Sequence, residues 1–355
     1  MKIGLLTVFY ANYGSYYQAV ALQKQLEQLG HECQIINASI RGKVATKFLL
    51  GVLGEKYLPN KVLDLIDKKN IPFKTYRAIK NALQDDAIGP IVFKAKKLNK
   101  TYDCIIVGSD ELWSATLDIM HYIPVYFGKD IRVPHMAYST SAISLKDPPP
   151  EMESEMRKGI NTFSAISVRD SETQQWIKKW TGKEVPITLD PTLLFPFFER
   201  EKRSGGGIIV YGEHFEEKHI DLIKKYAEKN HYPIHSVCWP LKWCDDFIDA
   251  QSPQALLDLF NSADFCVVST FHGTIFSLLN HQNFAAFCAP KRTNKIKGLL
   301  SQLEMGSCFW DENRDDEIEF SGDYSVFEKN IQVLRDRSLE YLTDALKTME
   351  KEIKD

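Results

Sequence analysis

A histidine follows one of the apolar runs in the second half of the chain. His272 lies in the turn Ser269–Gly273, directly after the apolar run Phe265–Val268. In open parallel sheets, ligands bind at the carboxyl ends of strands, where the following helices point N–H groups at anions. An imidazole exchanges protons near neutral pH, so His272 at a strand end suits acid-base chemistry or phosphate binding. A lone histidine is more often structural, but this position favours a functional one.

An arginine occupies the same kind of position in the first half. Arg169, with Asp170, follows the apolar run Ala165–Val168. A guanidinium there can hold a carboxylate or a phosphate by two parallel hydrogen bonds, whereas the alternative, a surface ion pair, contributes little. Polar residues follow three further apolar runs, in the segments Asn12–Ser15, Gly108–Glu111 and Ser139–Ser141. Such groups suit hydrogen bonding to a sugar or phosphate, although they are also common helix caps.

Parallel strands are needed to bring these residues together, and the first half of the chain predicts a set of them. The apolar runs are Ile3–Phe9, Cys33–Asn37, Tyr102–Val107, Pro134–Tyr138 and Ala165–Val168. Between the first two, apolar residues recur at helical spacing, and Gly30 follows where a left-handed cap belongs. Ser171 with Gln174 has the spacing of a capping box that begins another helix. This alternation predicts a parallel sheet covered on both faces, with the less regular, Lys-rich stretch Lys43–Lys100 inserted.

The alternation restarts after a stretch rich in proline and glycine between residues 188 and 207. Strands are predicted at Ile208–Tyr211, Ile234–Val237 and Phe265–Val268, and helices at Glu216–Lys229 and after Ser252, which would cap a helix that starts with proline. The tail from Tyr324 to Ile353 has the pattern of long amphipathic helices. We therefore expect an N-terminal Rossmann-like domain over 1–190, a C-terminal one over 191–323, and a helical tail, 324–355, that packs back on the first domain.

Composition limits the classes of function. The chain has 355 residues, 44% of them hydrophobic, and a net charge of −3 with Lys and Glu interspersed, which argues against a nucleic-acid partner. The seven cysteines are scattered and lack the spacing of a zinc site, so we expect reduced thiols, no metal and a cytoplasmic location. No apolar stretch approaches the ~20 residues of a membrane span.

Six motifs in order resemble polysaccharide pyruvyl transferases, and the resemblance extends over residues 3 to about 303. Each motif alone is weak, but the set is specific. The motifs are Asn12-Tyr13-Gly14 with Gln18-Ala19 and Ala21-Leu22-Gln23, Gly108-Ser109-Asp110-Glu111-Leu112-Trp113, Tyr138-Ser139-Thr140-Ser141, Ser167-Val168-Arg169-Asp170, Asp190-Pro191-Thr192-Leu193-Leu194, and Phe271-His272-Gly273-Thr274-Ile275-Phe276-Ser277.

The resemblance implies a glycosyltransferase-B-like fold, in which two Rossmann-like domains face each other across a cleft, the first on the acceptor side and the second on the donor side. It also implies transfer of a pyruvyl group from phosphoenolpyruvate to a sugar of a cell-surface polysaccharide precursor, with formation of a cyclic ketal. The acceptor would be a saccharide or a lipid-linked saccharide, and the latter would bring the protein to a membrane surface. This chemistry requires no cofactor. It leaves the oligomeric state open.

Mapped onto this sequence, the resemblance implies a role for each strand-end residue. His272 would be the general acid or a ligand of the donor phosphate, Asp110 or Glu111 a base or a ligand of sugar hydroxyls, and Arg169 a clamp on the donor. Further donor-binding candidates are Thr270, Gly273, Thr274, Lys291, Arg292 and Lys295, of which the lysines and Arg292 also fit a solvated basic loop. The acceptor-binding candidates are Asn12, Tyr13, Gly14, Ser109 and Ser139.

One departure and two alternatives accompany this interpretation. Members of the family often carry an arginine just before the pair that ends in histidine, and here Thr270 stands in that place. A triply anionic donor would then bind more weakly, unless Lys291, Arg292 or Lys295 supplies the charge. The alternatives are a nucleotide-sugar glycosyltransferase of the same architecture and a non-catalytic carbohydrate-binding protein. A fully buried, salt-bridged His272 would favour the latter.

Overall fold

The computed structural model describes residues 1–9, 12–36, 95–114, 122–197, 204–287 and 293–355 except 312 and 315, with short pieces between 38 and 89. Most of the stretch Lys43–Lys100, together with Lys291 and Arg292, lies outside the described residues. The chain forms two compact units. Unit 1 comprises Met1–Phe195 and Leu334–Asp355, and unit 2 comprises Pro196–Val333.

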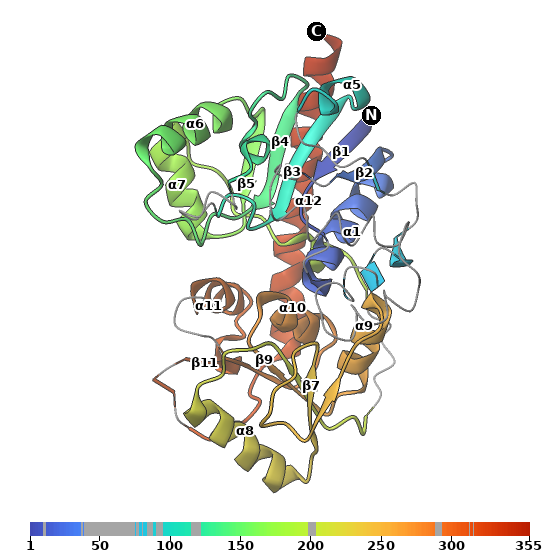
Figure 1. Ribbon diagram of the computed structural model, residues 1–355, viewed down its shortest axis with the longest axis vertical. Helices are drawn as coiled ribbons and strands as arrows, with labels where there is room; N and C mark the ends of the chain where they lie inside the picture. Colours follow the sequence, from blue (N-terminus) through green and yellow to red (C-terminus); the bar gives the residue numbers. More distant parts are fainter. Residues whose placement is uncertain are drawn as a thin grey trace, which may run out of the picture. The chain divides into compact units, whose positions relative to one another are not determined.

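Unit 1 is built on a parallel five-stranded sheet with the order β2-β1-β3-β4-β5. The strands are β1 (Lys2–Leu6), β2 (Glu32–Ile36), β3 (Cys104–Asp110), β4 (His135–Thr140) and β5 (Ala165–Val168). Its helices are α1 (Tyr13–Gln28), α5 (Leu98–Thr101), α6 (Pro150–Ile160) and α7 (Ser171–Thr181), with short 3-10 turns η2 (Pro124–Phe127) and η3 (Pro191–Leu194). Alternate strand residues such as Ile105 and Val107 pack in one buried cluster with Met156 of α6 and Ile177 of α7. Figure 1 shows these helices beside the sheet.

Unit 2 is built on a parallel six-stranded sheet with the order β11-β10-β9-β6-β7-β8. The strands are β6 (Ile208–Tyr211), β7 (Ile234–Val237), β8 (Asp246–Ile248), β9 (Phe265–Val268), β10 (Phe284–Phe287) and β11 (Phe309–Trp310). Its helices are α8 (Glu217–Asn230), α9 (Pro253–Ser262), α10 (Phe271–Leu279) and α11 (Thr293–Gln302), with the 3-10 turn η4 (Gly306–Cys308). The central strands are buried along their whole length, which explains their uninterrupted apolar sequence.

The last helix, α12 (Tyr324–Lys354), begins in unit 2 and ends in unit 1. Within unit 1, its Ser338 accepts a hydrogen bond from the backbone of Leu189, and the hydroxyl of Tyr341 donates to the carbonyl of Ala137. In Figure 1 it is the long red helix. Two α/β units with parallel sheets and a C-terminal helix confirm the fold class predicted from the sequence. None of the helices in the described ranges is both long and apolar enough to cross a lipid bilayer.

Three local predictions need correction. β3 and β4 do not end with their apolar residues, because β3 continues through Gly108, Ser109 and Asp110 and β4 through Ser139 and Thr140. Helix α7 is capped by Asp170 rather than Ser171, since the side chain of Asp170 accepts from the backbone N–H of Thr173. The segment Ser269–Gly273 is not a turn throughout, because α10 already begins at Phe271. The caps predicted at Gly30, with φ +87°, and at Ser252 are confirmed.

The connectivity defines one special position in each sheet. From β1 the chain adds β2 on one side and then β3, β4 and β5 on the other, so the strand order reverses between β1 and β3. In unit 2 it likewise reverses between β6 and β9. Crossovers leave opposite faces at such a point, which opens a crevice at the carboxyl ends of the strands where ligands of α/β sheets bind.

Candidate functional site

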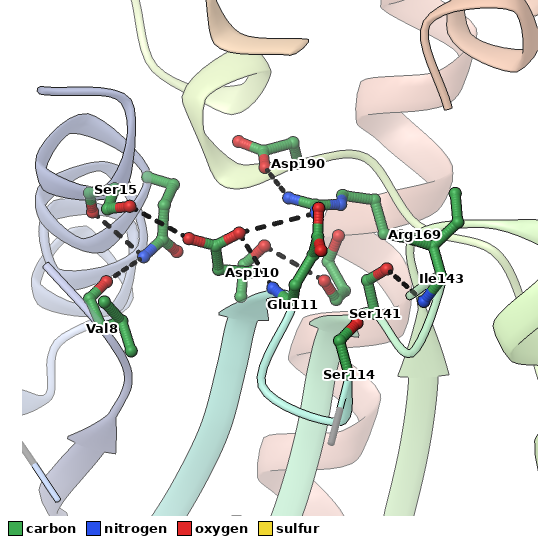
Figure 2. A network of polar contacts seen from close by, with 12 residues as sticks. Val8, Ser15, Asp110, Glu111, Ser114, Ser141, Ile143, Arg169 and Asp190 are labelled. Carbon is green, nitrogen blue, oxygen red and sulfur yellow. Dashed lines mark hydrogen bonds and ion pairs between the residues drawn. The ribbon is translucent and has the colours of Figure 1, made fainter. Parts of the chain in front are cut away.

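Asp110 lies at the reversal point of the first sheet, at the carboxyl end of β3. Its Oδ2 accepts a hydrogen bond from Ser15 Oγ (3.1 Å), and its Oδ1 accepts from the backbone N–H of Glu111 (2.8 Å) and lies 3.6 Å from Nη2 of Arg169. The side chain is 19% exposed, and Asp110 has a left-handed backbone with φ +88°. Figure 2 shows how these groups converge on the carboxylate. Non-glycine residues held in this conformation cluster at functional sites.

Arg169 follows β5 and reaches the same carboxylate from inside the unit. Its side chain is 4% exposed, and its Nη1 donates to Oδ2 of Asp190 (3.0 Å), whose side chain is completely buried. Burial disfavours the charged guanidinium, but the carboxylates of Asp110, Asp190, Glu111 and Asp170 outweigh burial and raise the pKa of Arg169. The guanidinium is therefore permanently charged and engaged by carboxylates of the protein itself.

Hydrogen bonds between distant segments hold the end of β3 in place. Gln18 of α1 donates to the hydroxyl of Thr7 and to the carbonyl of Val8, both of which follow β1, and Thr7 donates to the carbonyl of Ser109 (3.0 Å). The first turn of α1 is fixed by its exposed N-cap residue Asn12, which accepts from the backbone N–H of Ser15. Ser15 is thus held next to Asp110, because hydrogen bonds from Gln18 to Thr7 and from Thr7 to Ser109 connect α1 to the end of β3.

Several predicted acceptor-binding residues lie inside the fold. Ser109 and Ser139 are completely buried, and their hydroxyls donate to the carbonyls of Ser139 (3.0 Å) and Thr188 (3.3 Å). Tyr13 and Gly14 are buried in the first turn of α1, whereas Asn12 is exposed. In this structure the two serines join the ends of neighbouring strands, which explains how such polar residues are accommodated in the sheet.

The carboxyl ends of the strands of unit 1, called the strand edge of unit 1 below, carry several acidic side chains among the described residues. Asp110 and Glu111 lie at its centre, and Glu111 accepts a hydrogen bond from Ser144. Asp170 accepts from Ser141 Oγ (2.6 Å), and Asp190 is buried behind Arg169. Among the described residues, these four carboxylates surround one guanidinium, and this excess of negative charge disfavours a triply anionic molecule, whereas carboxylates suit the hydroxyl groups of a sugar. The charge of this edge therefore favours a neutral, hydroxyl-rich ligand.

His272 lies at the reversal point of the second sheet, in the first turn of α10. Thr270 caps this helix, since its Oγ1 accepts a hydrogen bond from the backbone N–H of Gly273 (3.0 Å). The imidazole is half-buried, with ring centroids 5.6 Å from Phe271 and 6.3 Å from Phe276. It is therefore neither fully exposed nor fully buried, and it stands where the helix dipole favours negative charge.

The neighbouring residues fix α10 against the end of β6. A side chain at Gly273 would place its Cβ 2.8 Å from Thr270 Oγ1 and 2.9 Å from the ring of Tyr211, so only glycine allows the close packing. The predicted donor ligand Thr274 is buried, and its hydroxyl donates to the carbonyl of Thr270. Ser269 donates to the carbonyl of Glu213 (2.7 Å). These contacts explain the run of small polar residues around His272.

Lys295 of α11 supplies a positive charge near the same helix, with its Nζ 5.8 Å from the ring centroid of Phe271. Together, a helix N-terminus, an imidazole and an ammonium group suit an anion more than a neutral sugar. In the part of the chain that the structure describes, there is no group of three or more His, Cys, Asp or Glu side chains that could hold a metal ion.

The sequence does not identify Asp190 as a site residue, and it does not predict that Ser15, in the polar segment Asn12–Ser15, pairs with Asp110. Asp190 pairs with Arg169 across 21 residues of chain, and Ser15 reaches Asp110 from α1. The sequence around Asp190 indicates only a helix cap, because Asp before a proline is typical of the start of a short helix. Asp190 does cap η3. No local pattern reveals its pairing with Arg169.

A family model described as polysaccharide pyruvyl transferase matches residues 12–287. A search of curated proteins finds no match. Similar solved structures include an alpha-glucosyltransferase in complex with UDP and DNA, with 9% identity, 100% of both chains covered and a TM-score of 0.49. They also include Arabidopsis thaliana UGT89C1 with UDP-L-rhamnose (8% identity, 99% of this chain and 98% of that chain, TM-score 0.46) and S. aureus MnaA with UDP (9% identity, 96% and 90%, TM-score 0.45).

Proposed function

We propose a function from the family to which the chain belongs, the polysaccharide pyruvyl transferases. The proposed activity is transfer of a pyruvyl group from phosphoenolpyruvate to a sugar of a cell-surface polysaccharide precursor. Besides the family, the main structural support for this proposal is the difference in charge between the strand edges of the two units. The acidic edge of unit 1 suits a sugar acceptor, and the edge of unit 2 around His272 suits an anionic donor. The substrates are then a small-molecule donor and a free or lipid-linked saccharide, and no nucleic acid is involved.

The proposed reaction joins two sugar hydroxyls to one carbon of the donor. The methylene carbon of phosphoenolpyruvate accepts a proton and becomes a methyl group, while the first hydroxyl oxygen bonds to the adjacent carbon and loses its proton. The second hydroxyl oxygen then bonds to the same carbon, loses its proton, and phosphate departs with the electrons of the broken C–O bond. One of the two released protons replaces the one consumed, and the other leaves with phosphate. The product is a cyclic ketal.

His272 is proposed as the general acid that protonates the methylene carbon, or as a ligand of the departing phosphate. Its place in the first turn of α10 supports either role, because the N–H groups and the dipole of the helix favour a phosphate beside it. Lys295 is proposed to add positive charge. Thr270, where arginine is common in the family, contributes a helix cap rather than a charge. Lys291 and Arg292 stay predictions from the sequence.

Asp110 is proposed as the base that takes a proton from a sugar hydroxyl, with Glu111 as the alternative. Asp110 is favoured because three hydrogen-bonding or ion-pairing groups fix its carboxylate at the reversal point, and a base works best when its position is fixed. Asn12, the exposed N-cap residue of the helix that carries Ser15, is proposed to contact the acceptor. The chemistry is complete without a cofactor, and a cytoplasmic location would give access to both substrates.

The proposal is tested with phosphoenolpyruvate labelled with ¹³C at the methylene carbon and a panel of free, nucleotide-linked and lipid-linked saccharides. Phosphate release should accompany a new ¹³C methyl signal of a ketal attached to one saccharide class. His235→Ala, which alters a histidine that pairs with Asp246 between β7 and β8, serves as a control for general effects of losing a histidine. Transfer of the sugar from a nucleotide-linked saccharide, with phosphoenolpyruvate unchanged, would instead identify a glycosyltransferase.

A further inference from the structure

Asp190 holds one arm of the Arg169 guanidinium in a fixed position. Its carboxylate is completely buried, its Oδ1 accepts from the backbone N–H of Thr192 (3.0 Å), and its Oδ2 accepts from Nη1 of Arg169 (3.0 Å). Because both oxygens are engaged and Asp190 itself caps η3, the carboxylate has little freedom to turn. Asp190 is therefore a rigid anchor and has no exposed surface with which to touch a substrate.

The anchored arm determines where the other arm of Arg169 lies. The guanidinium is planar and its side chain is only 4% exposed, so the bond from Nη1 to Asp190 restricts the position of Nη2, which lies 3.6 Å from Oδ1 of Asp110. A buried ion pair is weak as a source of stability, since the desolvation of both charges offsets most of their attraction. Its geometric effect is clearer, because Figure 2 shows Arg169 between Asp190 and Asp110, so it connects an enclosed carboxylate with one that is partly exposed.

We propose that Asp190 is a positioning residue that holds Arg169, and that Arg169 in turn fixes the carboxylate of Asp110 for proton transfer. The proposal rests on the proposed function for the role of Asp110 as a base. It gives Arg169 a task different from that of a clamp on the donor, and it gives Asp190 a task that the motif Asp190-Pro191-Thr192 does not reveal. Neither residue needs to contact a substrate.

Two substitutions that change the charge near Asp110 are then expected to affect its ionisation in opposite directions. The groups that face its carboxylate are Ser15 from α1, the adjacent Glu111, and Arg169, which is itself close to Asp190 and to Asp170 at the start of α7. Asp190→Asn removes a negative charge, so ionised Asp110 is favoured. Arg169→Met removes the positive charge, so ionised Asp110 is disfavoured. Asp344→Asn, at an exposed position of α12, removes the same charge as Asp190→Asn and is the matched control.

The test measures kcat, and KM for phosphoenolpyruvate, across pH in these variants. Below the acid limb of the profile the base is protonated and inactive. We expect Asp190→Asn to move this limb to lower pH and Arg169→Met to move it to higher pH, because the first removes a negative and the second a positive charge close to the base. We also expect kcat to fall by about tenfold in both, part of the 10²–10⁴ that a base contributes, with KM for phosphoenolpyruvate nearly unchanged. Arg169→Lys keeps the charge without the fork and should restore the position of the limb but only part of kcat.

A readout without turnover separates this proposal from the proposed function. The ¹³C carboxyl signal of Asp110, identified by its loss in Asp110→Asn, should respond to pH with the same opposite displacements even if no transfer of pyruvate is found. Arg169→Met that raises KM for phosphoenolpyruvate at unchanged kcat would overturn the proposal in favour of a donor clamp. Identical NMR titrations of the wild type, Asp190→Asn and Asp344→Asn would also overturn it, and this comparison remains available if Arg169→Met does not fold.

Discussion

Among the described residues, the strand edge of unit 1 holds its charged groups in ion pairs, whereas the strand edge of unit 2 holds a half-buried histidine at a helix N-terminus with Lys295 nearby. At the first edge Asp110, Arg169 and Asp190 form a chain of ion pairs that runs from the surface into the core. At the second edge His272 lies in the first turn of the capped helix α10 and contacts the rings of Phe271 and Phe276 of the same helix. Both edges lie at the reversal point of their own sheet, so topology selects the place and the side chains select the chemistry.

The two strand edges hold their reactive groups by different means, ion pairs and hydrogen bonds in unit 1 and aromatic contacts at a helix N-terminus in unit 2. The carboxylate of Asp110 is fixed by groups from α1, β3 and the end of β5, which suits a base that must meet a hydroxyl in one orientation. The imidazole of His272 is held by packing against Phe271 and Phe276, and the helix dipole supplies the electrostatic field. Substitutions at the two strand edges should therefore differ in their effects on activity and on stability.

The largest effect is expected at the edge of unit 2. His272→Ala should lower kcat for pyruvyl transfer by up to about 10⁴-fold, the upper range for loss of a general acid, while the fold stays intact because a half-buried ring is removed from a helix that alanine favours. Phosphate release and thermal unfolding measure the two effects. Turnover at the wild-type rate would remove His272 from the mechanism.

At the edge of unit 1 the largest effect is on stability. Arg169→Met should lower the free energy of unfolding of unit 1 by about 3–5 kcal/mol, because it leaves the carboxylate of Asp190 buried without a partner. Hydrogen exchange followed by mass spectrometry reports the two units separately. The double variant Arg169→Met with Asp190→Asn should recover part of the loss. If the double variant loses the sum of both single effects, the two charges are not coupled.

The next effect distinguishes the two carboxylates of that edge. Asp110→Asn should lower kcat by about 10²–10³-fold, since asparagine still accepts from Ser15 but takes no proton. Glu111→Gln is the matched control and should lower kcat by less than about tenfold. Steady-state rates at saturating acceptor measure both. The reverse order would transfer the role of base from Asp110 to Glu111.

The smallest effect concerns the cap of α10. Thr270→Ala should lower the free energy of unfolding by about 1 kcal/mol, because the N–H of Gly273 loses its acceptor. Thr270→Ser keeps the hydroxyl and should restore most of this loss, which urea unfolding measures. Equal stability of the alanine and serine variants would show that the contribution of Thr270 does not come from the cap.

The sequence predicts the central strands well, because strands buried on both faces have continuous apolar runs such as Phe265–Val268. It does not predict β10, an interior strand, or β8 and β11, which are short strands at the two edges of the sheet of unit 2. It also places the end of β3 too early. The strand continues through Ser109 and Asp110 because it stays paired with β4, where Asp110 lies opposite Thr140. Thr7 also donates to the carbonyl of Ser109, and Ser109 donates to the carbonyl of Ser139. Such partners lie far along the chain and have no local signature.

The sequence predicts where the candidate-site residues lie relative to the strands better than it predicts which side chains pair with one another. Placement after a strand identified His272, Arg169 and Asp110 correctly as strand-end residues, because the carboxyl ends of parallel strands lie at one edge. The partners of Arg169 could not be predicted, because a guanidinium that follows a strand can point outward to a ligand or inward to carboxylates. Burial against Asp190, 21 residues further along the chain, decides between the two.

Isothermal calorimetry of the wild-type protein with phosphoenolpyruvate, and separately with a panel of nucleotide sugars, tests the central claim most directly, because binding needs no knowledge of the acceptor. The account predicts that phosphoenolpyruvate binds and that this binding is weakened in His272→Ala but retained in Asp110→Asn. Binding of a nucleotide sugar alone, with no heat from phosphoenolpyruvate, would contradict it.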